Sequence, residues 1–210
     1  AWSQKTTEKI VQSAQLSLLN TLNIIPQGQE QKYGFNQRAD FNIAVVGKPI
    51  QVVTLSSAFF ENPNNKEIIF LNEWRVPIMV NQKTCTLFTV QKNNADFEVV
   101  DMGGSILGQE LENKISENDS ALLLRIFPLQ IDFMVKTQSD NHLEEAVYFP
   151  MESAKRIISA EKYQISYNQN DFFQLIRTIY SEQQTKNFRT GDDPHAGSIR
   201  QSSGRLRVCR

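Results

Sequence analysis

Histidine and cysteine, the side chains that most often carry catalysis or metal binding, are scarce in this chain. Two of each occur among 210 residues: His142, His195, Cys85 and Cys209. Two cysteines cannot form the disulfide framework of a small secreted domain, although one bond between Cys85 and Cys209 remains an option beside two free thiols. No nucleophile elbow, zincin motif, paired Cys-x-x-Cys or complete phosphate-binding loop is present. We therefore expect no metal, no cofactor and no catalytic residue.

Long apolar runs and strong net charge are also missing. No stretch approaches the ~20 apolar residues that span a bilayer, so no membrane span is expected. A formal net charge of -1 gives no reason to expect nucleic acid as a partner. At this length and 40% hydrophobic composition, one sizeable core is the better expectation.

Alternating apolar and polar residues are the dominant pattern, and they predict strands. Residues 74–80, 84–90 and 97–102 are joined by short polar turns, which permit only antiparallel neighbours and predict a meander at the centre of the fold. Pro77 lacks a donor N–H and predicts a sheet edge or a bulge. Pro128 predicts a bulge inside a long strand segment. The full set of expected strands is 49–56, 67–71, 74–80, 84–90, 97–102, 121–135 and 145–149.

Helical periodicity supplies the other elements. It predicts helices over residues 6–22, 36–46, 105–115, 150–159 and 170–183. Together the two patterns predict an α+β fold, with a mainly antiparallel sheet of about six to eight strands and helices packed on one face.

Residues 1–184 are expected to form a single α+β domain, and residues 185–210 a basic tail rich in Gly, Ser and Arg. The tail carries six basic and two acidic residues, a charge of +4, so the remainder of the chain carries -5. Its few apolar residues cannot offset the entropy of ordering, so no secondary structure is predicted for it. If the tail is ordered without a disulfide, we expect it to lie in a groove of its own body or of a neighbouring molecule.

Contact with a partner is the role we assign to the candidate site residues. Exposed aromatic side chains are favoured at interfaces, and arginines of a basic tail meet acidic surfaces. Core packing is the competing interpretation for the aromatics. The candidates are Phe59, Phe60, Trp74, Tyr148, Arg205 and Arg207.

Three weaker sites have simpler explanations. His142 beside Glu144 and Glu145 lacks a recognised metal-ligand spacing. Cys85 lies within a strand, where a packed thiol is the commoner state than an activated nucleophile. The Gly103-Gly104 pair ahead of a helix is typical of an anion site, but a tight strand-to-helix turn accounts for it equally.

The meander also resembles a known class of module. Trp74, the Val-Pro-Ile at 76–78, the polar turn at 81–83, Phe97 and the glycine pair leading into a helix are similar to the small sheet-plus-helix modules of secreted bacterial proteins. These include cystatin-like and PepSY-like propeptide or inhibitor domains. The resemblance implies a non-enzymatic binding or inhibitory module on the envelope side of a membrane, and it transfers no site residue.

The sequence thus predicts a binding or interaction protein, with an unknown protein or a small polar ligand as partner. A secreted or periplasmic location is expected, because the start Ala1-Trp2-Ser3 suits a mature form after removal of a signal peptide. A cloned fragment or a cytoplasmic protein would fit the same start. Two further functions stay open: a hydrolase or transferase that uses Cys85 or His142, and a self-associating structural component of the envelope.

Overall fold

The computed structural model describes residues 4–115, 120–137 and 143–191. The helices, including short 3-10 turns (η), and the strands follow one another as α1 Gln4–Leu22, η1 Glu30–Tyr33, η2 Arg38–Ile43, β1 Val45–Val46, β2 Ile50–Leu55, α2 Ser57–Glu61, β3 Ile68–Val80, β4 Lys83–Asn93, β5 Asp96–Gly103, α3 Ser105–Glu112, β6 Ser120–Ile126, η3 Phe127–Leu129, β7 Ile131–Thr137, η4 Leu143–Glu145, β8 Val147–Pro150, α4 Glu152–Lys155 and α5 Gln169–Gly191. The predicted α+β class is therefore confirmed.

One sheet of eight strands runs through the described part of the chain, in the order β5-β4-β3-β2-β6-β7-β8, with β1 paired to β3. The pairing of β2 with β6 is parallel, and the other pairings are antiparallel. The meander β3-β4-β5 lies at one end of this order. The strands predicted at 67–71 and 74–80 are a single long strand, β3, which joins the two halves of the sheet.

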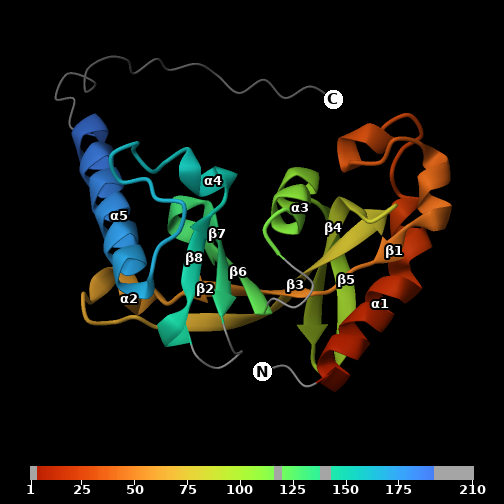
Figure 1. Ribbon diagram of the computed structural model, residues 1–210, viewed down its shortest axis with the longest axis horizontal. Coiled ribbons are helices and arrows are strands. Elements are labelled where there is room, and N and C mark those ends of the chain that lie inside the picture. Colours follow the sequence, from red (N-terminus) through yellow and green to blue (C-terminus); the bar gives the residue numbers. More distant parts are fainter. Residues whose placement is uncertain (1–3, 116–119, 138–142, 192–210) are drawn as a thin grey trace, which may run out of the picture.

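Helices cover both faces of the sheet, which corrects the prediction of one covered face. Leu87 and Phe88 are neighbours on β4, so their side chains point to opposite faces. Phe88 packs with residues of α1, whereas Leu87 packs with Leu111 of α3. The same alternation places α5 with α1, because Val53 packs with α5 residues and Val52 with the α3 cluster. Figure 1 shows α1 and α5 at opposite ends of the sheet, with α3 between them.

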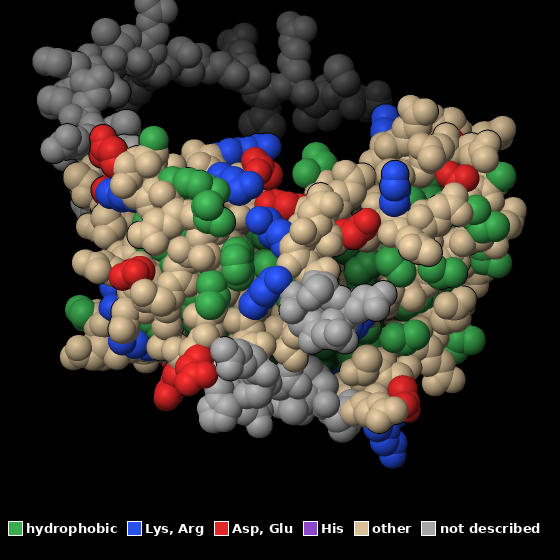
Figure 2. Space-filling view, in the orientation of Figure 1, with side chains coloured by type: hydrophobic (Ala, Val, Ile, Leu, Met, Phe, Trp, Pro, Cys, Tyr) green, Lys and Arg blue, Asp and Glu red, His purple; other side chains and the backbone are tan. Residues whose placement is uncertain are grey.

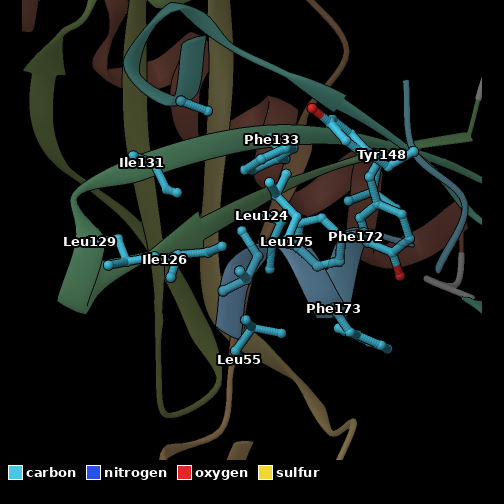
Figure 3. Close-up of a cluster of buried hydrophobic side chains, with 14 of the residues drawn as sticks. Leu55, Leu124, Ile126, Leu129, Ile131, Phe133, Tyr148, Phe172, Phe173 and Leu175 are labelled. Carbon is cyan, nitrogen blue, oxygen red and sulfur yellow. The ribbon is translucent and has the colours of Figure 1, made fainter. Parts of the chain in front are cut away.

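The buried side chains between α5 and strands β2, β6, β7 and β8 form one cluster, called here the cluster under α5, and it is the most aromatic part of the core. The rings of Tyr148 from β8 and Phe172 from α5 stack with centroids 4.1 Å apart and an interplanar angle of 6°. Phe133 of β7 meets Phe172 edge-on at 5.0 Å. Figure 3 shows these rings converging from the sheet and the helix. Burial of such large side chains is the main source of stability for this half of the protein.

Of the two proline predictions, the edge position of Pro77 and the bulge at Pro128 are wrong, whereas a bulge does lie next to Pro77. Pro77 lies within β3, a central strand, and not at a sheet edge. On the side of β3 that faces away from β4, Arg75 pairs with β2 and Ile78 pairs with β1. Pro77 lies in the gap between these two partner strands, so the sheet needs no backbone N–H from it there. A register shift does follow it, between Ile78 and Met79. Pro128 lies in a 3-10 turn that reverses the chain between β6 and β7, so the predicted long segment is a hairpin.

Several helix boundaries also differ from the prediction. Residues 36–46 form a short 3-10 helix and a two-residue strand, because the segment pairs with β3 at Val45 and Val46. The predicted helix at 150–159 shortens to α4. The last helix, α5, continues to Gly191, seven residues into the segment predicted as a tail. None of the helices in the described ranges is long and apolar enough to cross a membrane.

Candidate functional site

A cleft of about 580 Å³ opens on the face of the sheet that α3 covers. Its apolar wall comes from the start of β2, from β3, from β6 and from the end of α3, and consists of Pro49, Ile50, Pro77, Met79, Leu111, Ile115 and Ala121. Four polar residues complete the lining: Lys48, Gln82, Thr84 and Glu112. Small-molecule sites in proteins have this volume and this combination of apolar walls with a few polar groups.

The β3–β4 turn forms one side of the cleft. Asn81 and Gln82 connect the paired residues Val80 and Lys83, and their φ angles are 51° and 64°. Two successive residues with positive φ make a type I′ turn, the tight connection that matches the twist of a hairpin. Glycine adopts this backbone without strain, whereas glutamine does not. The chain therefore places a strained, polar side chain at the cleft.

Helix α3 approaches the sheet closely because it carries Gly108. A Cβ at this position would lie 2.7 Å from Cγ2 of Thr84 and 3.3 Å from Leu87. The approach lets Oε2 of Glu112 accept a hydrogen bond of 2.5 Å from the backbone N–H of Thr84. The carboxylate is thus fixed to the strand at the edge of the cleft.

A bulge in β4 decides which residues line the cleft. Ile78 pairs with Thr86 and Met79 pairs with Thr84, so Cys85 is the extra residue. Strict alternation would put Thr84 on the face of Phe88. The bulge instead turns Thr84 toward α3 and the cleft, and it buries Cys85 among the residues under α1.

Charged side chains lie on the same face, beyond the cleft. Arg75 donates to Oγ1 of Thr89 and to Oε1 of Glu73, the latter at 3.1 Å. Arg125 of β6 pairs with Asp132 of β7 at 2.9 Å. Burial lowers the pKa of Arg75, and its Nε is buried with no hydrogen-bond partner. Figure 2 shows acidic and basic side chains gathered between α3 and α4. Because these charges largely pair with one another, we interpret them as a structural network.

The predicted contact residues do not form one surface. Trp74 is 2% exposed and packs edge-on against Phe97, in the cluster under α1. Phe59 and Tyr148 are buried in the other cluster on that face, under α5. Phe60 is partly buried, with its ring 4.6 Å from that of Tyr180. Full burial excludes direct contact with an external partner, so the prediction is wrong for Phe59, Trp74 and Tyr148. Arg205 and Arg207 lie outside the described residues.

The weaker candidates gain no support as catalytic groups. Burial raises the pKa of the Cys85 thiol, as do the nearby charges of Asp40 and Glu112, which disfavours a thiolate nucleophile. Within the described ranges, no three His, Cys, Asp or Glu side chains are grouped to hold a metal ion. His142, His195 and Cys209 lie outside those ranges. Gly104 has a φ of 74° at the start of α3, the conformation of a tight strand-to-helix turn.

Gln82 and Glu112, two of the four polar residues that line the cleft, were not singled out by sequence reasoning. The turn at 81–83 was predicted, but its left-handed backbone at Gln82 and its position beside α3 carry no motif. Comparison with known proteins adds no further assignment: no protein family matches the chain, and no curated protein or solved structure is significantly similar to it.

Proposed function

We propose that this protein is a binding module whose cleft beside α3 takes a small ligand that is mostly apolar and has a polar end. The observation that carries the proposal is the cleft itself, with its volume of about 580 Å³ and its few polar groups. A mainly apolar lining favours burial of an apolar ligand body, and the polar groups fix its orientation.

The polar groups also limit the chemistry of the ligand's end. Glu112 has one oxygen bonded to Thr84 N–H, so the carboxylate is held in place without a protein cation on that atom. Lys48 contributes a positive charge to the same lining. A ligand with a cationic or hydrogen-bond-donating end is favoured at Glu112.

The strained turn gives independent support. Left-handed backbone in a residue other than glycine costs about 1–2 kcal/mol, and such strain gathers at ligand sites. Of the two strained residues in this turn, Gln82 lines the cleft.

A fluorescence titration with 1-anilinonaphthalene-8-sulfonate tests the proposal. We expect one probe molecule to bind per chain, and binding to weaken about tenfold or more in Ala121→Phe, which fills the apolar wall. Val147→Phe adds the same ring on the edge strand β8 and serves as the matched control. Displacement of the probe by short fatty acids or by apolar amines then identifies the favoured polar end. Equal binding by wild type and Ala121→Phe would refute the cleft as the site.

We further propose a secreted or periplasmic location, supported by the resemblance of the meander to envelope modules. Fractionation of cells that express the complete gene tests this, and accumulation in the cytoplasm would contradict it.

A further inference from the structure

Strand β5 forms one end of the sheet, and no strand of the described residues pairs with its outer side. At its start, the hydroxyl of Ser13 in α1 donates to the carbonyl of Phe97 at 2.6 Å. From Glu98 onward none of the described hydrogen bonds covers the edge, and Val100 is 49% exposed. An unpaired strand edge offers backbone donors and acceptors to any extended chain that fits it.

The two faces of β5 differ sharply in character. Phe97, Val99 and Met102 pack against the cluster under α1. Asp96, Glu98 and Asp101 are exposed, and the strand contains no basic residue. The three acids make no ion pair within the described part of the chain. The register shift between Val99 and Asp101 keeps the acids together on one side.

This charge selects the kind of strand that can add to the edge. Pairing of β5 with β5 of a second copy would bring six carboxylates together, which is unfavourable. A strand with basic residues on one face and apolar residues on the other would match both faces of β5. Its basic side chains would lie beside the acids, and its apolar side chains would extend the cluster under α1.

The chain itself contains such a segment. Residues 205–210 read Arg-Leu-Arg-Val-Cys-Arg, so Arg205 and Arg207 alternate with Leu206 and Val208. Over residues 205–208 this is the period of two expected of a strand with one basic and one apolar face, and the same period puts Cys209 on the side of the arginines and Arg210 on the apolar side. It lies in the segment of charge +4, opposite in sign to the remainder of the chain.

The connecting segment, when extended, is longer than the sheet is wide. Residues 192–204 follow the end of α5 and span up to about 44 Å when extended. The first turns of α5 pack beside β8, six strand spacings or about 29 Å from β5, and the tail leaves from Gly191 at the other end of this 23-residue helix. Because the segment is tethered, its effective concentration at the edge is in the millimolar range, and a free peptide would have to be added at a similar concentration to bind as well.

We propose that residues 205–210 dock along the outer edge of β5 of the same chain, with Arg205 and Arg207 beside Glu98 and Asp101 and with Leu206 and Val208 toward α1. The docked segment covers the free edge of the sheet. This inference does not depend on the cleft beside α3, and its tests do not involve the ligand.

Hydrogen exchange of the full chain tests the contact. In Arg205→Glu/Arg207→Glu, amides of residues 98–102 should exchange about tenfold faster than in the wild type. Adding Glu98→Lys and Asp101→Lys to that variant should restore protection, because the charges are then reversed on both sides. Equal exchange in the wild type and in the arginine variant would overturn the proposal.

Disulfide trapping with the native Cys209 distinguishes docking within one chain from docking between chains. Cys209 lies two residues beyond Arg207, so in a Cys85→Ala background it should couple under mild oxidation to Gly103→Cys if the docked segment is parallel to β5, or to Asp96→Cys if it is antiparallel, and give a monomeric cross-link. Val147→Cys, on the opposite edge of the sheet, is the control. Disulfide-linked dimers as the main product, or equal coupling in the control, would overturn the proposal.

Discussion

Replacing Gln82 with glycine should stabilise the protein and weaken its binding site at the same time. The turn requires positive φ at Gln82, which costs a residue with a Cβ about 1–2 kcal/mol. Glycine removes this cost but gives the unfolded chain more freedom, an offset of about 0.4–1 kcal/mol. The substitution also creates Asn-Gly, the pair that type I′ hairpins favour most.

The expected net gain in the free energy of unfolding is about 0.5–1 kcal/mol, which for a domain of this size raises Tm by about 1–4 °C. Binding should change in the opposite direction, because Gln82 lines the cleft. Loss of one polar contact, worth about 1 kcal/mol, weakens affinity about fivefold. Thermal denaturation followed by circular dichroism measures the first effect, and titration with 1-anilinonaphthalene-8-sulfonate measures the second.

Asn81→Gly is the matched control for this experiment. Asn81 has a φ of 51° in the same turn but is not part of the cleft lining. Asparagine tolerates the left-handed region better than glutamine does, so the gain in stability should be smaller and probe affinity should not change. A lower Tm in Gln82→Gly would refute the strain at this turn, and unchanged affinity would remove Gln82 from the site.

Three further predictions concern the packing. Gly108→Ala should lower the free energy of unfolding, measured by urea denaturation, by about 1–3 kcal/mol, because the new Cβ would lie 2.7 Å from Cγ2 of Thr84. Gly103→Ala is the control and should be near neutral, because no atom lies within 4 Å of its Cβ. Equal losses in the two variants would contradict the close approach of α3. Burial raises the pKa of Tyr148 to about 12, so the phenol loses its proton at lower pH in the unfolded state than in the folded state. The free energy of unfolding should therefore fall by up to ~2.7 kcal/mol between about pH 10 and 12. Tyr148→Phe should remove that fall, and an alkaline profile that the substitution leaves unchanged would contradict the prediction. Trp74→Ala should cost about 3–5 kcal/mol, as for a core residue, and a loss under 1 kcal/mol would return Trp74 to the candidate contact residues.

The sequence by itself determined the local elements, because their causes are local. The alternation in residues 74–102 and the short turns between the strands left only an antiparallel meander, which is observed as β3, β4 and β5. The apolar stripe at Ile10, Ala14, Leu18 and Leu22 likewise fixed the buried side of α1. These patterns reflect which side of an element faces the core, and each is encoded within a dozen residues.

Tertiary structure alone decided where these elements meet. The parallel pairing of β2 with β6 joins segments about 70 residues apart, and no local pattern specifies it. It places α3 over the opposite face of the sheet and so creates the cleft. The bulge at Cys85 turns Thr84 toward Glu112 through pairing with β3, whose register is a property of two strands and not of one. Burial of Trp74 and Tyr148 follows from the helices above them, which is why aromatic residues that sequence alone leaves open as contacts are core residues in the fold.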